Sequence, residues 1–344
     1  MEVDYGEIEA VLEKITGKPV GFESLVEEAL AGESLFSIGK WLGLFGNVMT
    51  EQLKFHSQKI GYLLVLILSA AVLSVIAKAF RNRQISDMGF YMIFLLLSLI
   101  LMRSFGVCYE LTSSVIGDMI DFMKVLMPAY LMAAAASAYR TSAVVYYEGF
   151  LLMIYYLQKV VASVLMPGIR CYVLLSVLSY LGKEDFFSRG RETLKKMILW
   201  GLKLLIGIAG GLQMIQGMIS PAIDEMKHTV FSKGISSLGS VGNVAQNVTD
   251  VILGSGALLK NGIGVAGAIC ILLICLFPVA QVSGYAVFYQ LLSAAAEPIS
   301  DKRLVDVIEK MGEGIGLLVK VLFTVCAMFL LSISIICVTT GGIR

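Results

Sequence analysis

The chain has 344 residues, of which 57% are hydrophobic and 15% charged, with a formal net charge of +1 and a mean hydropathy of +0.82. Soluble proteins carry about 25% charged residues, so the composition excludes an ordinary soluble domain and predicts an all-α, polytopic helical membrane protein. The near-zero net charge argues against a nucleic-acid partner, which would favour a basic patch.

The first 58 residues are predicted to form an acidic, amphipathic region outside the membrane or at its interface. Residues 1–35 carry nine acidic side chains. Apolar residues recur there at helical spacing in two stretches, which predicts two amphipathic helices. These residues are Ile8, Val11, Leu12 and Ile15, then Phe22, Leu25, Val26 and Ala29. Denser apolar residues around Trp41 are typical of a helix lying in the interface.

Apolar runs define the membrane helices, since a helix needs about 20 apolar residues to cross the hydrocarbon core. We expect six to seven spans. The candidate runs are 60–77, 88–102, 143–164, 197–218, 262–280 and 314–338. Shorter runs beside prolines predict re-entrant or broken helices. These shorter runs are 125–138, 169–181 and 285–296.

Basic residues in short loops predict the orientation, because Lys and Arg gather on the cytoplasmic side. The stretches 78–83, 183–196 and 302–310 contain Lys and Arg and are predicted to lie inside. Residues 219–260 are rich in Gly, Ser and Asn and predict an extracytoplasmic helical layer. The predicted partner-docking residues there are Asp250, Lys260 and Asn261. The predicted regions are 1–58, a first membrane region at 59–218, the layer at 219–260, and a second membrane region at 261–344.

The glycine spacing allows two interpretations. NGIGVAG at 261–267 contains G-x-G-x-x-G, which in a soluble enzyme can bind a dinucleotide. That fingerprint requires a preceding strand and an acidic residue roughly 20 residues on, whereas the segment that follows is apolar up to Ala280 and the next acid is Glu297. We therefore predict helix packing, because glycine lets helix backbones approach in lipid. The packing residues are Gly207, Gly211, Gly262, Gly264 and Gly267.

Three charged residues, Glu148, Lys203 and Lys320, fall inside apolar runs. A charge at mid-bilayer costs about 2.5–3.5 kcal/mol on insertion scales, so each needs a reason. We expect Lys203 and Lys320 to face a hydrated interior, either a conduit or a junction between subunits. Glu148 is expected to neutralise one of them.

No cofactor, metal or catalytic residue is expected. The six cysteines form no C-x-x-C pair, and only His56 and His228 could add imidazole ligands. This spacing excludes an ordinary zinc or iron–sulfur site and predicts buried free thiols. An intramembrane enzyme would need a nucleophile–base pair or metal ligands at depth, and Glu148 offers neither.

Two stretches of the chain resemble each other, and an internal duplication is one interpretation. YVLLS at 172–176 matches YQLLS at 289–293, an offset of 117 residues (289 minus 172), and at this offset Lys203 matches Lys320. In both copies a short apolar segment leads through a charged stretch into a long span. Both charged stretches are predicted inside, so the copies would be parallel.

Several local motifs in the carboxy-terminal two-thirds are specific enough for comparison with a known family. GLQ at 211–213 ends a predicted helix, and a Gly-rich segment and an Asp-x-Val helix at Asp250 follow. LLKNGIGVAG at 258–267 and FYQLLSAAAEPISDKRL at 288–304 continue the series. With these motifs the chain resembles the stage III sporulation protein AE family, and the order of apolar runs agrees upstream to Tyr62.

The resemblance implies a cell-membrane protein of the mother cell, in the outer membrane around the forespore. It implies membership of a secretion-like channel complex that links the two cells, with an ATPase and extracytoplasmic rings supplied by other subunits. The expected partners are those membrane and ring subunits and lipid, and a homo-oligomer is allowed. Family members carry a secretory signal; either such a signal or the first span would carry the acidic segment across.

Two functions stay open at this point. One is a non-enzymatic, multi-pass subunit of the channel, which should co-purify with partner proteins. The alternative is an independent secondary transporter, which should bind a small solute when purified alone.

Overall fold

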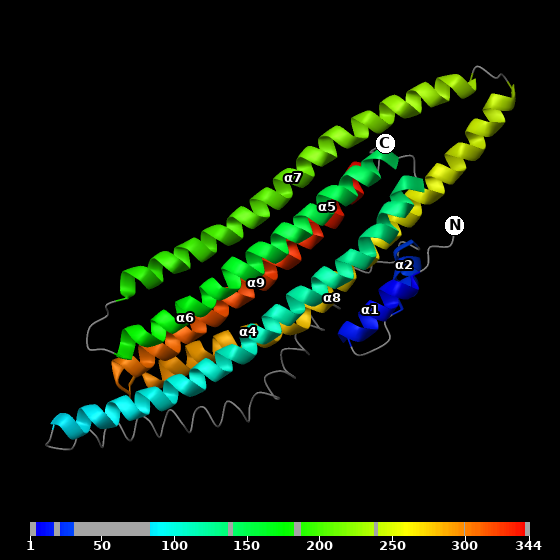
Figure 1. Cartoon of the computed structure of the whole chain (residues 1–344). Coiled ribbons are helices and arrows are strands. Elements are labelled where there is room, and N and C mark those ends of the chain that lie inside the picture. Colours follow the sequence, from blue (N-terminus) through cyan, green and yellow to red (C-terminus); the bar gives the residue numbers. More distant parts are fainter. Residues whose placement is uncertain are drawn as a thin grey trace.

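The computed structural model describes residues 5–16, 21–30, 83–136, 140–181, 187–236, 240–298 and 300–340, and the regular structure in these ranges is helical. Long helices lie side by side in an elongated bundle (Figure 1). They are α4 (Arg83–Ala136), α5 (Arg140–Val160), α6 (Met166–Leu181), α7 (Ser188–Ser236), α8 (Ser240–Ala296) and α9 (Lys302–Thr340). The predicted all-α class is confirmed.

Four helical stretches in the described part of the chain are long and apolar enough to cross a membrane, so the protein is a polytopic helical membrane protein. They are Met88–Ala135, Glu148–Leu181, Leu258–Ala296 and Lys302–Cys337. This count is lower than the six to seven expected, because four of the six candidate runs, 88–102, 143–164, 262–280 and 314–338, correspond to these stretches. The first three stretches each also include one of the shorter runs. The runs 60–77 and the segment around Trp41 lie outside the described residues, and 197–218 lies within α7.

The prolines do not break the helices in the way the sequence predicts. Pro128 lies inside α4 and Pro278 inside α8, so 125–136 and 285–296 are ends of continuous helices rather than re-entrant segments. A helix buried among neighbours tolerates proline, because nearby groups satisfy the carbonyls it leaves free. Pro167, by contrast, lies at the start of α6, directly after a π-helical turn at Val161–Leu165. That turn joins α5 to α6 and accommodates the ring and the missing N–H of the proline.

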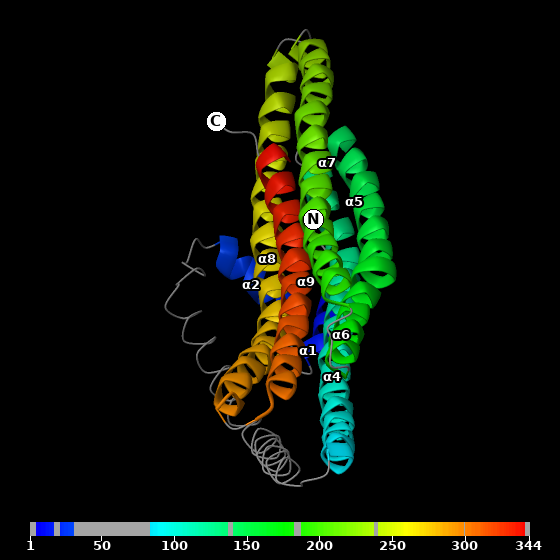
Figure 2. The same ribbon diagram turned by 90° about the vertical axis from the view of Figure 1, so that its left-hand side faces the viewer.

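The described parts of the basic stretches, at the beginnings of α4, α7 and α9, lie at one end of the bundle. The Arg303 guanidinium lies 3.7 Å from the centre of the Phe90 ring, so the beginning of α9 lies beside the beginning of α4. The end of α6 and the beginning of α7 lie at this same end, whereas the α7–α8 hairpin extends past the other helices at the far end (Figures 1 and 2). The segments predicted inside and outside therefore lie at opposite ends, and which end is cytoplasmic stays a prediction.

The two amphipathic helices form near the amino terminus as α1 (Gly6–Thr16) and α2 (Phe22–Leu30). The first packs against α4 and the second against α8. Of the apolar residues that predict them, Ile8, Leu12, Phe22 and Val26 are buried. The Phe22 N–H donates a hydrogen bond of 2.8 Å to Glu9 Oε1, so α1 caps the beginning of α2 with a carboxylate.

Candidate functional site: a carboxylate shared by three helices

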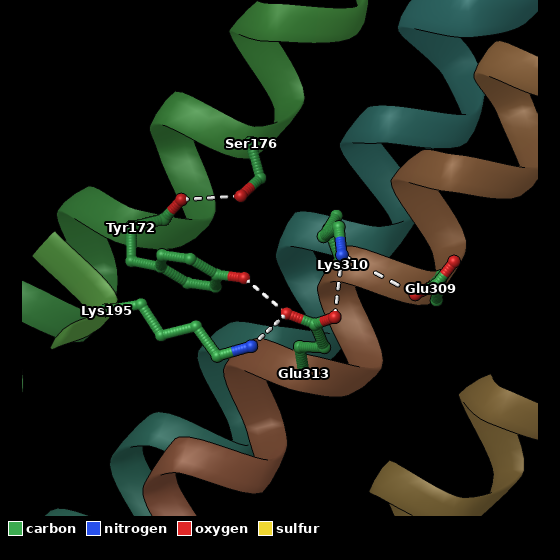
Figure 3. A network of polar contacts seen from close by, with 6 residues as sticks. All are labelled: Tyr172, Ser176, Lys195, Glu309, Lys310 and Glu313. Atoms are coloured by element: carbon green, nitrogen blue, oxygen red, sulfur yellow. Dashed lines mark hydrogen bonds and ion pairs between the residues drawn. The ribbon is translucent and has the colours of Figure 1, made fainter. Parts of the chain in front are cut away.

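Glu313 of α9 accepts hydrogen bonds from side chains of three helices (Figure 3). Its Oε2 receives the Tyr172 hydroxyl of α6 at 2.7 Å and Lys195 Nζ of α7 at 2.8 Å. Its Oε1 receives Lys310 Nζ, one turn earlier on α9, at 2.6 Å. We call Tyr172, Lys195, Lys310 and Glu313 the Glu313 cluster.

The position of the Glu313 cluster follows from the sequence of α9. The first turns of this helix, up to Glu313, are charged, and the apolar part begins at Gly314. A Cβ added at Gly314 would overlap Val173 Cγ2, so only glycine lets α9 come this close to α6. That close approach brings the hydroxyl of the neighbouring Tyr172 onto the carboxylate.

The cluster is suited to holding helices together rather than to acid–base chemistry. The side chain of Glu313 is 22% exposed and that of Lys195 35%, so both lie in partly dry surroundings where charge-assisted hydrogen bonds gain strength. Both oxygens of Glu313 already accept bonds from cations or a phenol, and two ammonium groups oppose one carboxylate. Three of the roughly four lone-pair sites of the carboxylate are therefore occupied, which leaves little room for the proton of a substrate.

The Tyr172 hydroxyl gives a direct test of the cluster. Tyr172→Phe is expected to lower the stability of the purified chain by about 1.5–3 kcal/mol, because it removes one hydrogen bond to a charged acceptor without leaving a cavity. The measurement is thermal unfolding in detergent. Tyr156→Phe serves as the control, since Tyr156 is 60% exposed. Equal melting curves for both variants would show that the cluster does not stabilise the bundle.

Three of the five predicted packing glycines lie at helix contacts. A Cβ added at Gly264 would lie 3.0 Å from Tyr130 Cε2, and one at Gly267 would lie 2.5 Å from Leu126 Cδ2, both on α4. At Gly262 it would lie 3.0 Å from Leu30 Cγ of α2. The structure thus brings these glycines of the G-x-G-x-x-G stretch against neighbouring helices.

The other two glycines have no such neighbour. A Cβ added at Gly207 or Gly211 meets nothing within 4 Å, and both residues are exposed on α7. The packing prediction for these two is therefore not met within one chain, because no described helix covers this face of α7.

Glu148, Lys203 and Lys320 are all exposed on the surface of the bundle, and the structure does not bring them together. Gly201 faces Leu165, so Lys203 lies near the middle of the α5–α6 rod. From there Glu148 is roughly 20 Å away at 1.5 Å per residue. At this distance Glu148 cannot neutralise Lys203 within one chain, contrary to what we expected from the sequence.

The same separation applies to Lys320. Ser332 of α9 donates a hydrogen bond to the sulfur of Met153, which fixes the relative depth of α9 and α5. The two helices run in opposite directions, so Glu148 and Lys320 lie on opposite sides of this contact, again more than roughly 20 Å apart. That the two lysines face a hydrated junction stays a prediction.

The predicted docking residues differ in their surroundings. Lys260 is fully buried, so it lies inside the bundle and not on a docking surface. Asn261 is exposed, and its Oδ1 accepts a hydrogen bond of 3.4 Å from Cys337 Sγ. Asp250 belongs to α8, but its side chain lies outside the described part of the structure.

Sequence reasoning missed the Glu313 cluster. Its long-range contacts join residues 118 and 141 positions apart, which no local pattern reveals. The one available signal is the placement of Glu313 as the last acid before an apolar run, one turn after Lys310. Among the residues that the structure describes, no three His, Cys, Asp or Glu side chains are grouped so that they could hold a metal ion.

Long apolar helices packed through glycines, with the Glu313 cluster joining three of them, define a polytopic helical membrane protein. Residues 20–340 match the stage III sporulation protein AE family, and the chain belongs to that family. The resemblance found in the sequence is confirmed. Over 318 residues the chain is 22% identical to stage III sporulation protein AE of Bacillus subtilis (strain 168), covering 92% of this chain and 79% of that protein. No solved structure matches the chain.

Proposed function

We propose that the chain is a non-enzymatic, multi-pass subunit of a secretion-like channel that links mother cell and forespore during endospore formation. In this proposal it lies in the outer forespore membrane and contacts other membrane and ring subunits of the same complex. Membership of a sporulation protein family supports the biological setting. The features of the bundle itself support the role as a subunit.

The observation that carries the proposal is the exposure of Lys203 and Lys320 within apolar helices. A lysine facing hydrocarbon is unfavourable, and Glu148 of the same chain is too far away to neutralise either one. In this proposal a neighbouring subunit supplies counter-charges or hydrogen-bond partners for these two lysines, or water hydrates them. An independent transporter places charges at a binding site inside its own bundle, and neither Lys203 nor Lys320 lies there.

The non-enzymatic part of the proposal is supported by the Glu313 cluster. The cluster joins three helices through one carboxylate that accepts three hydrogen bonds, and holding the bundle together accounts for these contacts. Its one hydroxyl belongs to Tyr172 and is bonded to the carboxylate, so the cluster contains no serine, cysteine or threonine nucleophile.

Lys320→Met gives the test. We expect this variant to insert and accumulate like the parent chain but to lose partner proteins on purification from sporulating cells by more than about ten-fold, since loss of a buried interfacial charge contact costs at least about 2 kcal/mol. The number of heat-resistant spores should fall with it. The measurements are quantitative co-purification through a tag and spore counts.

Lys196→Met is the matched control, because Lys196 is also exposed but lies in the charged first turns of α7, outside the apolar run. It should leave both readouts unchanged. Normal spore counts and normal co-purification for Lys320→Met and for Lys203→Met would reject the subunit role of these lysines. Saturable binding of a small solute by the isolated chain, without partners, would support the transporter instead.

A further inference from the structure

The exposed face of α4 is polar over a length that matches the membrane. Residues alternately four and three positions apart lie on one face of a helix, and between 103 and 124 this face carries one apolar residue, Val107. The remaining members define the α4 stripe: Arg103, Glu110, Ser114, Gly117, Asp121 and Lys124. The stripe covers 21 residue steps (124 minus 103). At 1.5 Å per residue this is about 31 Å, close to the roughly 30 Å of the hydrocarbon core.

The α4 stripe is open to its surroundings. All its members are exposed except Gly117, which is half-buried. A Cβ added at Gly117 meets nothing within 4 Å. The side chains of Asp121 and Lys124 are 65% and 45% exposed although they pair with each other at 3.1 Å. No described helix therefore covers this face of α4.

The part of α4 that carries the stripe runs beside the apolar part of α9. A Cβ added at Gly314, where that part begins, would lie 3.9 Å from Phe105 Cε2 of α4. Farther along, a Cβ added at Gly264 of α8 would lie 3.0 Å from Tyr130 of α4 and 3.8 Å from Ile333 of α9. Between these two contacts α4 and α9 run side by side, and this stretch of α9 belongs to a candidate membrane span.

At this depth the exposed faces of the two helices differ in kind. The exposed face of α9 carries Phe323 and Leu331, with Lys320 as its charged residue. The exposed face of α4 carries four charged side chains along the stripe. One lysine can be accommodated by a local contact, but four charged side chains and one hydroxyl on one helix face, over about the thickness of the hydrocarbon core, are not compatible with lipid.

We propose that the α4 stripe borders a water-filled path across the membrane. This inference rests on the proposed function as a channel subunit and assigns one helix face to the wall of the path. The charges of the stripe have both signs, with Arg103 and Lys124 at its ends and Glu110 and Asp121 between them. Such a wall hydrates polar molecules without selecting strongly for one ionic sign, unlike a ring of like charges.

Cysteine accessibility tests the proposal on the full chain in membranes. Ser114→Cys is compared with Phe323→Cys, because Ser114 lies nine residues after Phe105 and Phe323 lies nine residues after Gly314, which places both at the same depth. Both are made in a chain whose exposed Cys171 is replaced by serine. A charged, membrane-impermeant methanethiosulfonate reagent should modify Ser114→Cys about 100-fold faster than Phe323→Cys, since the mid-bilayer penalty for a charge corresponds to about two powers of ten.

Gly117→Cys should react like Ser114→Cys, because the added side chain points into open space. If both stripe cysteines react as slowly as Phe323→Cys, the stripe is covered by lipid or protein and the proposal is wrong. When the unreactive variants still support sporulation and co-purification, the subunit role stands and only the path is misplaced. Fast labelling in a chain that proves dispensable for sporulation would instead keep the hydrated face and reject the proposed function.

Discussion

Gly267→Leu is expected to destabilise the bundle by about 1–3 kcal/mol, the range for overpacking a filled interior. The added Cβ alone would lie 2.5 Å from Leu126 Cδ2. Leu126 is 1% exposed, so either its side chain must take another rotamer in the packed interior or α4 and α8 must separate to admit the leucine. The change should lower the melting temperature of the purified chain and reduce its amount in membranes.

Gly207→Leu is the control for this prediction. It makes the same change in composition at a helical glycine of the apolar run of α7, but a Cβ there meets nothing within 4 Å. We expect its melting temperature to match that of the parent chain. A similar loss in both variants would mean that added bulk in lipid, rather than the contact with Leu126, causes the effect.

Glu313→Gln is expected to reduce the free energy of unfolding by about 1–3 kcal/mol, the penalty for leaving charged donors without their partner. Glutamine keeps the shape of the side chain but removes the charge that Lys195 and Lys310 share at 2.8 and 2.6 Å. The ends of α6, α7 and α9 should then loosen together. Chemical unfolding of the purified chain and protease cleavage between α6 and α7 would measure the two effects.

Glu309→Gln is the matched control, because Glu309 also lies near Lys310, at 3.5 Å, but its side chain is 48% exposed. An exposed pair of this kind contributes about 0–1 kcal/mol. A double-mutant cycle of Glu313→Gln with Lys195→Met should be clearly non-additive, since the two residues are in direct contact. Additive losses, or equal losses for Glu309→Gln and Glu313→Gln, would contradict a stabilising role of the Glu313 cluster.

Local patterns in the sequence predict some elements well. The apolar positions of α1 and α2 follow a helical period, and members of both sets, Ile8, Leu12, Phe22 and Val26, are the buried residues of these helices. A Cβ added at Gly262, Gly264 or Gly267, the glycines that the sequence predicts to pack, would lie 3.0 Å or less from a side chain of a neighbouring helix. In each case a few neighbouring residues decide the outcome, so periodicity or side-chain size is sufficient.

Other features depend on residues far apart in the chain. Whether Pro128 and Pro278 break a helix depends on what packs around them, and this cannot be read from a run of apolar letters. The Glu313 cluster joins three helices, and no local sequence pattern distinguishes Lys195, which belongs to it, from Lys196, which does not. The burial of Lys260 is likewise set by neighbouring helices, whereas its charge, at the end of the local sequence LLK, favours a surface position.

The α7–α8 hairpin extends well beyond the apolar run of α8. Twenty-two residues of α8 (262 minus 240) precede the apolar run expected to begin at Gly262, and at 1.5 Å per residue they rise about 33 Å. The Debye length at physiological salt is about 8 Å, so the far end of the hairpin is about four screening lengths from the start of that run. Anionic headgroups therefore neither attract nor repel a molecule that arrives there. Recognition at that height has to come from direct contact with the helices, and it should be insensitive to the lipid composition of the membrane below.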